Sequence, residues 1–355
     1  MLRADVEVDR RDFTVRAAIE VAAGERLALF GPSGAGKTTL LEAIAGLVQP
    51  RAGLIELADR TLTRTTAPRV LVPAWQRRVG LLRQDPGLFP HLSVRDNLAY
   101  ARSADPRGTE LAEVARALEI GELLDAMPAR LSGGQQHRTA LARLLLARFD
   151  ALLLDEPYSG LDAVLRRTLT ALVVRLVTER AVPSVLVAHE LADAQSFADR
   201  MAVLDQGEIL QVGEPDQVVL RPCSARVAEL VGYLGFAPVP GRPGVLAGVH
   251  PERIAAGAAP ERGLVLTGRV AGSRPAGAAW EADLLLPDSG QDGALSQQAV
   301  RGRDGRPGLA ATVTCRLADR PGADGDTMTV TVLDPPCFSQ DGIAVDGHVR
   351  EGSRP

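Results

Sequence analysis

Lysine is almost absent from this sequence. Lys and Arg together number 40 among 355 residues, yet Lys37 is the only lysine. Every other basic side chain is an arginine, so the lysine at this one position requires a geometric reason. The formal net charge is −4 at pH 7, which excludes the overall basic field that draws proteins to nucleic acid.

Cysteine is also scarce. The three cysteines, Cys223, Cys315 and Cys337, lie far apart and form no Cys-x-x-Cys pair. This number and spacing exclude a disulfide framework and predict free thiols in a reducing compartment. The apolar content of 46% and charged content of 24% are ordinary for globular domains, and the length suffices for two or three of them.

Long hydrophobic runs are missing as well. No stretch of about 18 uncharged apolar residues occurs, so we expect no transmembrane helix. The first residues, MLRADVEVDRRD, are charged and strand-like, unlike a signal peptide. We therefore expect any membrane role to depend on a partner protein.

The first two thirds of the chain alternate strand-like and helical segments. Short apolar runs end at Gly31 (ERLALF), at Asp155 (DALLLDEP) and at His189 (PSVLVAH). Helical spacing follows Lys37 and returns over residues 93–130, including a segment from 110 to 124, and over residues 132–148. This alternation predicts an α/β fold with a mainly parallel sheet and phosphate chemistry at its carboxyl edge.

The composition changes near Phe236. Residues 236–355 hold 18 of the 35 glycines and 12 of the 24 prolines, a density that argues against long helices. The short runs GLVLTGRV, WEADLLL, LAATVTCRL and TMTVTVL remain. They favour a small β-barrel-like domain with long loops and a flexible C-terminal tail.

The segment GPSGAGKTT fits the phosphate-loop pattern G-x-x-x-x-G-K-[ST], with an apolar strand before it and a helix after it. Its backbone N–H groups can surround phosphate oxygens at a helix N-terminus. Thr38 offers a hydroxyl to Mg²⁺, and Lys37 offers a compact ammonium where the planar arginine fork does not fit. The candidate nucleotide-binding residues here are Gly31, Pro32, Ser33, Gly34, Ala35, Gly36, Lys37, Thr38 and Thr39.

Two further motifs narrow the chemistry. Ser132, Gly133, Gly134 and Gln135 open a helix and form a second candidate anion site. Because Lys37 already serves one phosphate site, a second such site suggests a second copy of the chain. Asp155 and Glu156 end a strand, where the first can help to hold Mg²⁺ and the second can orient or deprotonate a water.

The order and spacing of these motifs, with Ser159-Gly160-Leu161-Asp162 and His189 after them, resemble the ATP-binding cassette (ABC) ATPase family over roughly residues 1–235. The resemblance implies that two cassettes dimerise head to tail. Each loop Ser132–Gln135 would then cover ATP held by the other copy, and Asp162 is a further candidate nucleotide-binding residue. The resemblance also implies that His189 contacts the γ-phosphate.

Gln84, in RRVGLLRQDPGLFPHLSV, resembles the family's Q-loop glutamine. The resemblance implies that Gln84 touches Mg²⁺ and the water, and that residues from about 85 to 130 form the helical subdomain. Phe89, Pro90 and His91 then lie in a loop that we expect to dock against a permease.

The sequence departs from the family at a few positions. Phe13 is the nearest aromatic residue for stacking on adenine, but packing within its strand is favoured, which leaves the preference for ATP over GTP open. Arg83 stands where relatives often have an aromatic residue. His137 replaces a common glutamine, and Gly160 a usual alanine.

Val249-His250-Pro251-Glu252-Arg253 resembles the opening of the TOBE accessory domain of importer ATPases, which is related to molybdate-binding Mop barrels. We assign residues 236–355 to such a domain. The cassette itself is similar to that of molybdate-type importers, and molybdate or tungstate is the leading solute. Sulfate, ferric iron, thiamine and polyamine remain alternatives.

The resemblance implies an ATPase with ATP and Mg²⁺ as cofactors that works as a homodimer on two transmembrane permease subunits. An extracytoplasmic solute-binding protein would act indirectly, and no nucleic acid would be bound. The location implied is peripheral, at the cytoplasmic face of the plasma membrane.

Two other classes of function remain open. A soluble ABC ATPase acting on DNA or the ribosome would resemble tandem cassettes or carry long coiled coils, whereas this sequence has one P-loop and no heptad run. An anion-sensing regulatory protein, in which the C-terminal barrel inhibits ATP turnover, is compatible with the importer hypothesis.

Overall fold

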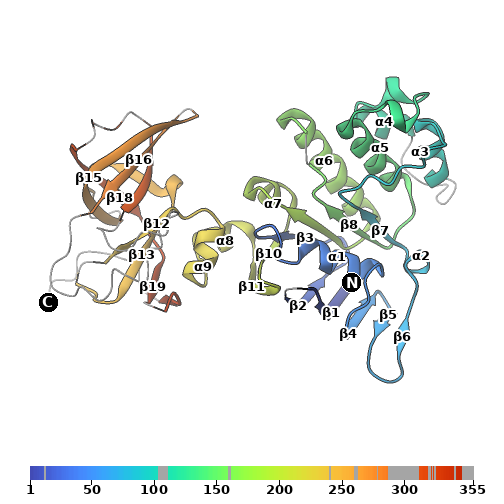
Figure 1. Cartoon of the computed structure of the whole chain (residues 1–355), viewed down its shortest axis with the longest axis horizontal. Helices are drawn as coiled ribbons and strands as arrows, with labels where there is room; N and C mark the ends of the chain where they lie inside the picture. The colour runs from blue at the N-terminus through green and yellow to red at the C-terminus, as the bar shows by residue number, and fades with distance from the viewer. Residues whose placement is uncertain are drawn as a thin grey trace. The chain divides into compact units, whose positions relative to one another are not determined.

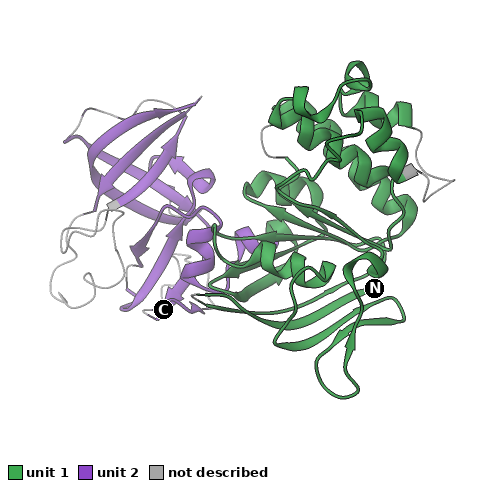
Figure 2. Cartoon of the chain, turned by 45° about the vertical axis from the view of Figure 1, so that its right-hand side comes forward, with its two compact units in different colours: residues 1–216 green, residues 217–355 purple. Residues whose placement is uncertain are grey.

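The computed structural model describes residues 1–11, 13–102, 111–158, 161–239, 241–259, 263–277, 279–286, 312–318, 321, 323, 325–339 and 341–345. The chain separates into two compact units, residues 1–216 and 217–355 (Figure 2). The sequence-based boundary lies later, between residues 235 and 236, so the helix Ala225–Leu230 falls in the second unit rather than in the first. The predicted flexible tail lies outside the described residues.

An eleven-stranded sheet forms the centre of the first unit, in the order β6-β5-β4-β1-β2-β11-β10-β3-β9-β8-β7 (Figure 1). From β10 to β7, neighbouring strands run parallel, which confirms the predicted α/β fold. The strands are β1 (Leu2–Asp9), β2 (Thr14–Val21), β3 (Arg26–Phe30), β4 (Ala52–Leu57), β5 (Arg60–Arg64), β6 (Val70–Leu71), β7 (Val79–Leu82), β8 (Ala151–Asp155), β9 (Ser184–Ala188), β10 (Arg200–Asp205) and β11 (Glu208–Gly213).

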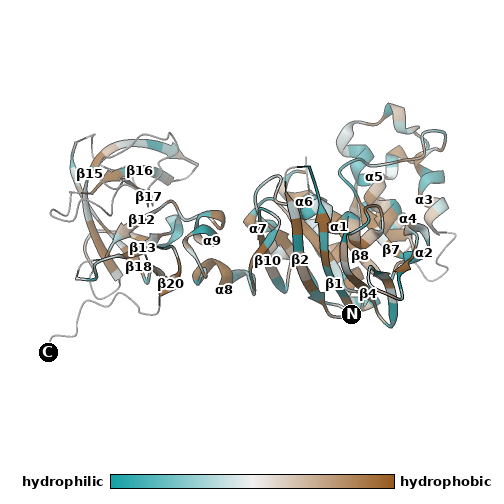
Figure 3. Ribbon diagram, turned by 60° about the horizontal axis from the view of Figure 1, so that its bottom comes forward, coloured by the Kyte–Doolittle hydropathy of each residue, from teal (hydrophilic) through white to brown (hydrophobic). Residues whose placement is uncertain are grey.

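The residue pattern of each strand explains its place in the sheet. Every residue of β8 and β9 is buried, as expected for strands covered by helices on both faces. Along β1 and β2, buried and exposed residues alternate, and Figure 3 shows hydrophobic and hydrophilic residues following each other there. The alternation marks the part of the sheet with one buried face.

Seven α-helices lie in the described part of the first unit. They are α1 (Lys37–Ala45), α2 (Ala74–Arg77), α3 (Val94–Arg102), α4 (Leu111–Ala117), α5 (Gly133–Leu146), α6 (Ala163–Arg180) and α7 (Leu191–Phe197). Helices α3, α4 and α5 pack together, in the region expected for a helical subdomain (Figure 1). No helix in the described residues is both long and apolar enough to cross a membrane.

The sequence-based helix from residue 110 to 124 was too long. Helix α4 ends at Ala117, because Glu119 adopts a positive φ of 52° and residues Gly121–Leu123 form a separate 3₁₀ turn. A residue in this left-handed conformation ends a right-handed helix. Val114, Ala115 and Leu118 are buried, which agrees with the helical spacing of the segment.

The second unit contains two antiparallel sheets, with strand orders β12-β13-β19-β20 and β14-β18-β15-β16-β17. A single hydrophobic cluster draws side chains from both sheets, including the thiols of Cys315 and Cys337. The four apolar runs that the sequence indicated lie in β15 to β18. The strands are β12 (Gly235–Pro238), β13 (Val245–Val249), β14 (Ile254–Ala256), β15 (Gly263–Ala276), β16 (Ala279–Leu285), β17 (Thr312–Leu317), β18 (Thr327–Leu333), β19 (Cys337–Ser339) and β20 (Ala344–Val345), and the helix of this unit is α9 (Ala225–Leu230), preceded by α8 (Pro215–Leu220).

Arg77, at the end of α2, is a fully buried arginine that fixes helix α1 from its carboxyl end. Its guanidinium donates to the carbonyls of Ala43 (3.1 Å) and Ile44 (2.9 Å) in the last turn of α1. It also donates to the carbonyl of Val72 (2.9 Å) and to the hydroxyl of Thr63 (2.8 Å). A cation at this position satisfies orphan carbonyls and complements the helix dipole.

We predict that Arg77→Ala lowers the free energy of unfolding by at least about 3 kcal/mol, because the carbonyls would stay buried without a donor beside a new cavity. Arg78→Ala is the matched control. Arg78 is 44% exposed in its ion pair with Asp150, so its loss should cost about 1 kcal/mol or less. Urea unfolding of the two variants compares them, and equal midpoints would refute a special role for Arg77.

Candidate nucleotide-binding site

The carboxyl ends of four neighbouring parallel strands bring the candidate residues to one edge of the sheet. Strand β3 leads into Gly31, β8 ends at Asp155, and β9 leads into His189. Strand β7 pairs with β8 and ends just before Gln84. Ligands of α/β sheets bind at this edge, so the sequence-predicted residues lie where such a site is expected.

Two glycines of the P-loop are required by the packing of this chain. Gly31 has a φ of +150°, and a Cβ there would collide with the carbonyl of Leu204. Gly36 has a φ of +106°, and a Cβ there would lie 2.6 Å from a methyl group of Val15. The loop therefore depends on residues without side chains both for its backbone conformation and for its closeness to β10 and β2.

Lys37 is 5% exposed, and its ammonium lies inside the loop. Its Nζ donates to the carbonyl oxygens of Gly31 (2.7 Å) and Pro32 (2.8 Å). Burial lowers the pKa of Lys37, while the nearby carboxylates of Glu156 and Asp155 act in the opposite direction. A compact donor fits between two carbonyls in this way, which is the geometric reason for a lysine in a chain of arginines.

Asp155 and Thr38 form a pair of oxygen donors beside the loop. Asp155 is 4% exposed and its carboxylate hydrogen-bonds the Thr38 side chain, but its Oδ1 has no partner among the described residues. Burial raises the pKa of Asp155, and the Thr38 bond partly offsets this. A buried oxygen without a partner beside a hydroxyl suits Mg²⁺, which prefers such ligands. Gln84 is exposed, and its role at the metal stays a prediction.

Glu156 and His189 are in contact, with the carboxylate Oε1 of Glu156 bonded to Nε2 of His189. Glu156 adopts a positive φ of 53° directly after β8, and its side chain is 21% exposed. The pair lies at the rim of the site, where a carboxylate held by an imidazole can orient a water and accept its proton. The sequence indicated each residue separately but not their contact.

Ser132 caps helix α5 together with Gln135. The hydroxyl of Ser132 accepts from the backbone N–H of Gln135 (3.3 Å), and the side chain of Gln135 accepts from the N–H of Ser132 (2.9 Å). A Cβ added at Gly133 or Gly134 would meet nothing within 4 Å. Unlike the P-loop glycines, these two are not required by packing within the chain.

His137 is a residue whose role at the site the sequence did not reveal. It is 7% exposed on α5, and its ring hydrogen-bonds the carbonyl of Pro157, which directly follows Glu156. Its Nε2 has no partner in the part of the chain that the structure describes, and burial lowers the pKa of the ring. The imidazole thus joins the helix that begins at Ser132 to the loop that carries Glu156. The sequence feature that could have indicated this role is a histidine on the buried face of helix α5.

Asp162 is the N-cap of α6, where its carboxylate accepts from the backbone N–H groups of Val164 and Leu165, both at 2.9 Å. The bond from Leu165 is the main cause of its lowered pKa. A contact with nucleotide stays a prediction for Asp162, and Ser159 and Gly160 lie outside the described residues. Phe13 is half-buried, with its ring against Gly36 and the core of the first unit.

Residues 16–159 match the family model for ABC transporters. The first unit of the chain is similar to ABC transporter cassettes. The matched residues include the P-loop, the loop Ser132–Gln135 and the acidic pair Asp155–Glu156 at the end of β8.

Curated relatives of the cassette are ATP-binding proteins of importers. The molybdenum import protein ModC of Mesorhizobium japonicum is 41% identical over 223 residues, and ModC of Mycobacterium tuberculosis is 42% identical over 241 residues. These matches cover 62% and 65% of this chain, and 60% and 64% of the relatives. The ferric iron import protein FbpC of Mesorhizobium japonicum is 41% identical over 217 residues, covering 60% of this chain and 59% of that relative. The matched part thus spans less than two thirds of the relatives' own length.

Solved structures support the fold. A dimeric ATP-binding cassette in a post-hydrolysis state, bound to ADP and Pi, superposes with a TM-score of 0.52 at 24% identity. It covers 61% of this chain and 99% of that structure. An ATP-binding subunit of an ABC transporter gives a TM-score of 0.53 at 24% identity, covering 61% of this chain and 91% of that structure.

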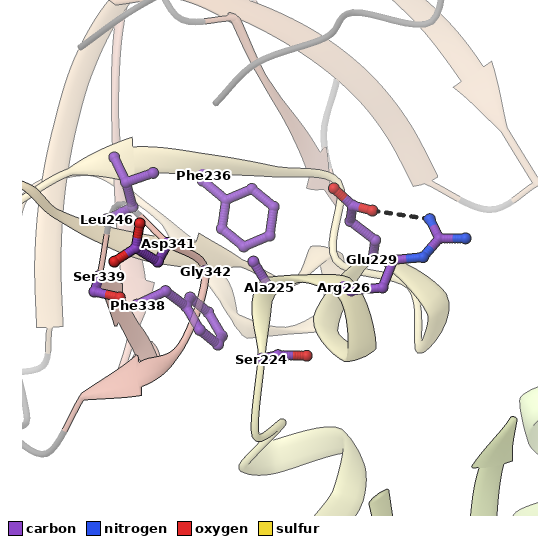
Figure 4. Close-up of a pocket in the computed structure, with 10 residues that line it drawn as sticks. All are labelled: Ser224, Ala225, Arg226, Glu229, Phe236, Leu246, Phe338, Ser339, Asp341 and Gly342. Atoms are coloured by element: carbon purple, nitrogen blue, oxygen red, sulfur yellow. Dashed lines mark hydrogen bonds and ion pairs between the residues drawn. The ribbon is translucent and has the colours of Figure 1, made fainter. Parts of the chain in front are cut away.

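The second unit has a cavity of about 330 Å³ beside α9 (Figure 4). Phe236, Leu246 and Phe338 form its apolar wall. Arg226 on its rim pairs with Glu229 at 3.1 Å, and Asp341 adds a further carboxylate. Because the cation is already neutralised by a partner, these lining residues do not favour a small oxyanion.

Proposed function

We propose that this chain is the ATP-hydrolysing subunit of an ABC importer. The observation that carries the proposal is the meeting of three groups at one sheet edge: the buried ammonium of Lys37, the Thr38–Asp155 pair and the Glu156–His189 pair. Phosphate binding, metal binding and activation of a water are the three tasks of phosphoryl transfer to water.

Each group has a definite task in this proposal. On nucleotide binding, the Lys37 ammonium leaves the carbonyls of Gly31 and Pro32 and pairs with the β- and γ-phosphates. Thr38 and Oδ1 of Asp155 would hold Mg²⁺, which would supply charge neutralisation at the phosphates. Glu156 orients the attacking water and accepts its proton, and His189 positions that carboxylate and reaches the γ-phosphate.

A second copy of the chain would complete the site. A Cβ at Gly133 or Gly134 would meet no described atom within 4 Å, so this surface is open to a second copy. Their backbone N–H groups begin α5, where an anion is favoured. We propose a head-to-tail homodimer in which this surface approaches the nucleotide bound by the other copy.

A permease is the second proposed partner. The loop from Phe89 to Ser93 is fixed by the fully buried Asn97, whose amide donates to the carbonyls of Phe89 (3.2 Å), Leu92 (3.0 Å) and Ser93 (3.0 Å). Pro90 and His91 are exposed, while Phe89 is half-buried against Tyr100 and Arg143. A preformed loop with exposed apolar surface suits docking of a cytoplasmic permease helix at little entropic cost.

Molybdate or tungstate is the solute we propose, since two molybdenum import proteins are 41% and 42% identical to the matched part of this chain. Ferric iron is the nearest alternative, because an iron import protein matches at similar identity; sulfate, thiamine and polyamine stay open. Anion sensing by the second unit is less favoured, because the cavity beside α9 offers no unpaired cation among its lining residues. The proposed location is the cytoplasmic face of the plasma membrane.

We predict that Glu156→Gln reduces steady-state ATP hydrolysis by about 10³-fold while MgATP binding is kept, because only proton acceptance is lost. With MgATP the variant should form a stable dimer in size-exclusion chromatography with light scattering. The double variant Glu156→Gln/Ser132→Arg should bind MgATP and stay monomeric, because the added side chain blocks the approach to the second copy. Normal hydrolysis by Glu156→Gln, or a dimer of the double variant, would contradict the proposal.

We predict that a strain lacking this chain loses uptake of labelled molybdate and regains it with the wild-type chain but not with the Glu156→Gln variant. Labelled ferric iron and sulfate are measured in the same strains as controls. Unchanged molybdate uptake with a loss of iron or sulfate uptake would reassign the solute, whereas no change for any of the three would refute import of these solutes.

A further inference from the structure

The turn between β1 and β2 lies against the P-loop. The backbone N–H of Arg10 donates to the carbonyl of Phe13 (2.9 Å), which closes the turn. The ring of Phe13 lies 3.4 Å from the position of a Cβ at Gly36. Phe13 therefore places this turn beside the P-loop.

Arg10 extends its side chain over the first turns of helix α1. Its Nε donates to the hydroxyl of Thr39 at 2.8 Å, and a terminal nitrogen donates to Oε2 of Glu42 at 3.0 Å. Thr39 and Glu42 are three residues apart on one face of α1, so the guanidinium lies along that face. Thr39 is 7% exposed, the side chain of Glu42 16% and that of Arg10 35%, so the contacts are only partly screened by water.

The position on α1 determines which phosphate this guanidinium can reach. Lys37 begins the helix and serves the β- and γ-phosphates, and Thr38 serves the metal. The backbone N–H groups of the loop and of the start of the helix hold the α- and β-phosphates. A cation bonded to the hydroxyl of Thr39, one residue further into the helix, is on the α-phosphate side of the site.

We propose that Arg10 binds the α-phosphate of the nucleotide. The inference rests on the proposed function, since it requires nucleotide in this P-loop. Guanidinium groups bind phosphate oxygens through forked hydrogen bonds that are stronger than those between neutral groups.

Glu42 allows Arg10 to change partners. Its Oε1 accepts from a terminal nitrogen of Arg83 at 3.3 Å, while Oε2 accepts from Arg10. When a phosphate takes over the terminal nitrogens of Arg10, the carboxylate of Glu42 keeps Arg83 as a cationic partner. Arg83 directly precedes Gln84, so the same carboxylate connects the α-phosphate side of the site to the segment that carries the predicted Q-loop glutamine.

Arg10 should contribute affinity without selecting the base. The α-phosphate is common to ATP and GTP, so a guanidinium bound there stabilises both nucleotides equally. Removal of Arg10 should therefore weaken both by the same factor and leave the ratio of their affinities unchanged.

The experiment compares Arg10→Ala, Arg10→Lys and the matched control Arg11→Ala by isothermal titration with MgATP and MgGTP. Arg11 lies in the same turn and is exposed, so its replacement changes the net charge equally. Arg10→Ala should weaken both nucleotides by about 10- to 100-fold, the value of one charge-assisted contact. The affinities of Arg10→Lys should lie between those of the wild type and Arg10→Ala. The affinities of Arg11→Ala should stay within about twofold of wild type.

The Sp and Rp diastereomers of ATPαS, bound with Mg²⁺, locate the contact. The wild-type chain should discriminate between them, and Arg10→Ala should bring their affinities closer together, because sulfur on one side of the α-phosphorus weakens the guanidinium bond. Thermal unfolding of each variant without nucleotide separates this effect from a loss of folding.

Three outcomes would overturn the proposal. They are wild-type affinity in Arg10→Ala, an equal loss in Arg11→Ala, and a changed ratio of ATP to GTP affinity with unchanged diastereomer discrimination. The absence of nucleotide binding by the wild-type chain would instead refute the proposed function.

Discussion

The arrangement of the site depends on the Lys37 ammonium held between the carbonyls of Gly31 and Pro32. A buried cation requires donors and acceptors around it, and here the loop itself supplies them. The ammonium bridges two carbonyls of the P-loop and attracts the carboxylates of Asp155 and Glu156 at the end of β8. Replacing two neutral carbonyls by charged phosphate oxygens gives the lysine a stronger partner in the same place, which favours binding of a polyphosphate.

Helix α1 connects the site around Lys37 to three other segments of the first unit. Its amino end carries Lys37, one of its faces carries Glu42, which pairs with Arg10 and Arg83, and its carboxyl end is held by Arg77. The helix is therefore one rigid element that contacts the β1–β2 turn and the segment before Gln84. Through Arg77 it also contacts β5 and the residue that follows β6. A nucleotide that rearranges the partners of Lys37 and Arg10 acts on all three, as expected where a packed helix transmits a local change.

Strand ends were the most predictable part of the site. Strands β3, β8 and β9 could each be predicted from an apolar run that ends at a glycine, an acid or a histidine. Strands buried on both faces require such continuous apolar sequence. The contact between Glu156 and His189 could not be predicted in the same way. It depends on the parallel register of Asp155 with Val187 and on the positive φ of Glu156, neither of which is set by local sequence.

Two adjacent arginines show most clearly what could not be predicted from the sequence. Arg77 and Arg78 are the same residue type side by side, yet one is fully buried among neutral acceptors and the other pairs with Asp150 at the surface. The difference arises from the direction of each side chain at the end of a short helix, which composition and spacing do not encode.

The most direct test of the account is a crystal structure of the Glu156→Gln variant with MgATP. We predict that Nζ of Lys37 leaves the carbonyls of Gly31 and Pro32 for oxygens of the β- and γ-phosphates, and that Thr38 and Asp155 hold Mg²⁺. A nucleotide bound with Lys37 still on both carbonyls, or bound away from the loop, would contradict it.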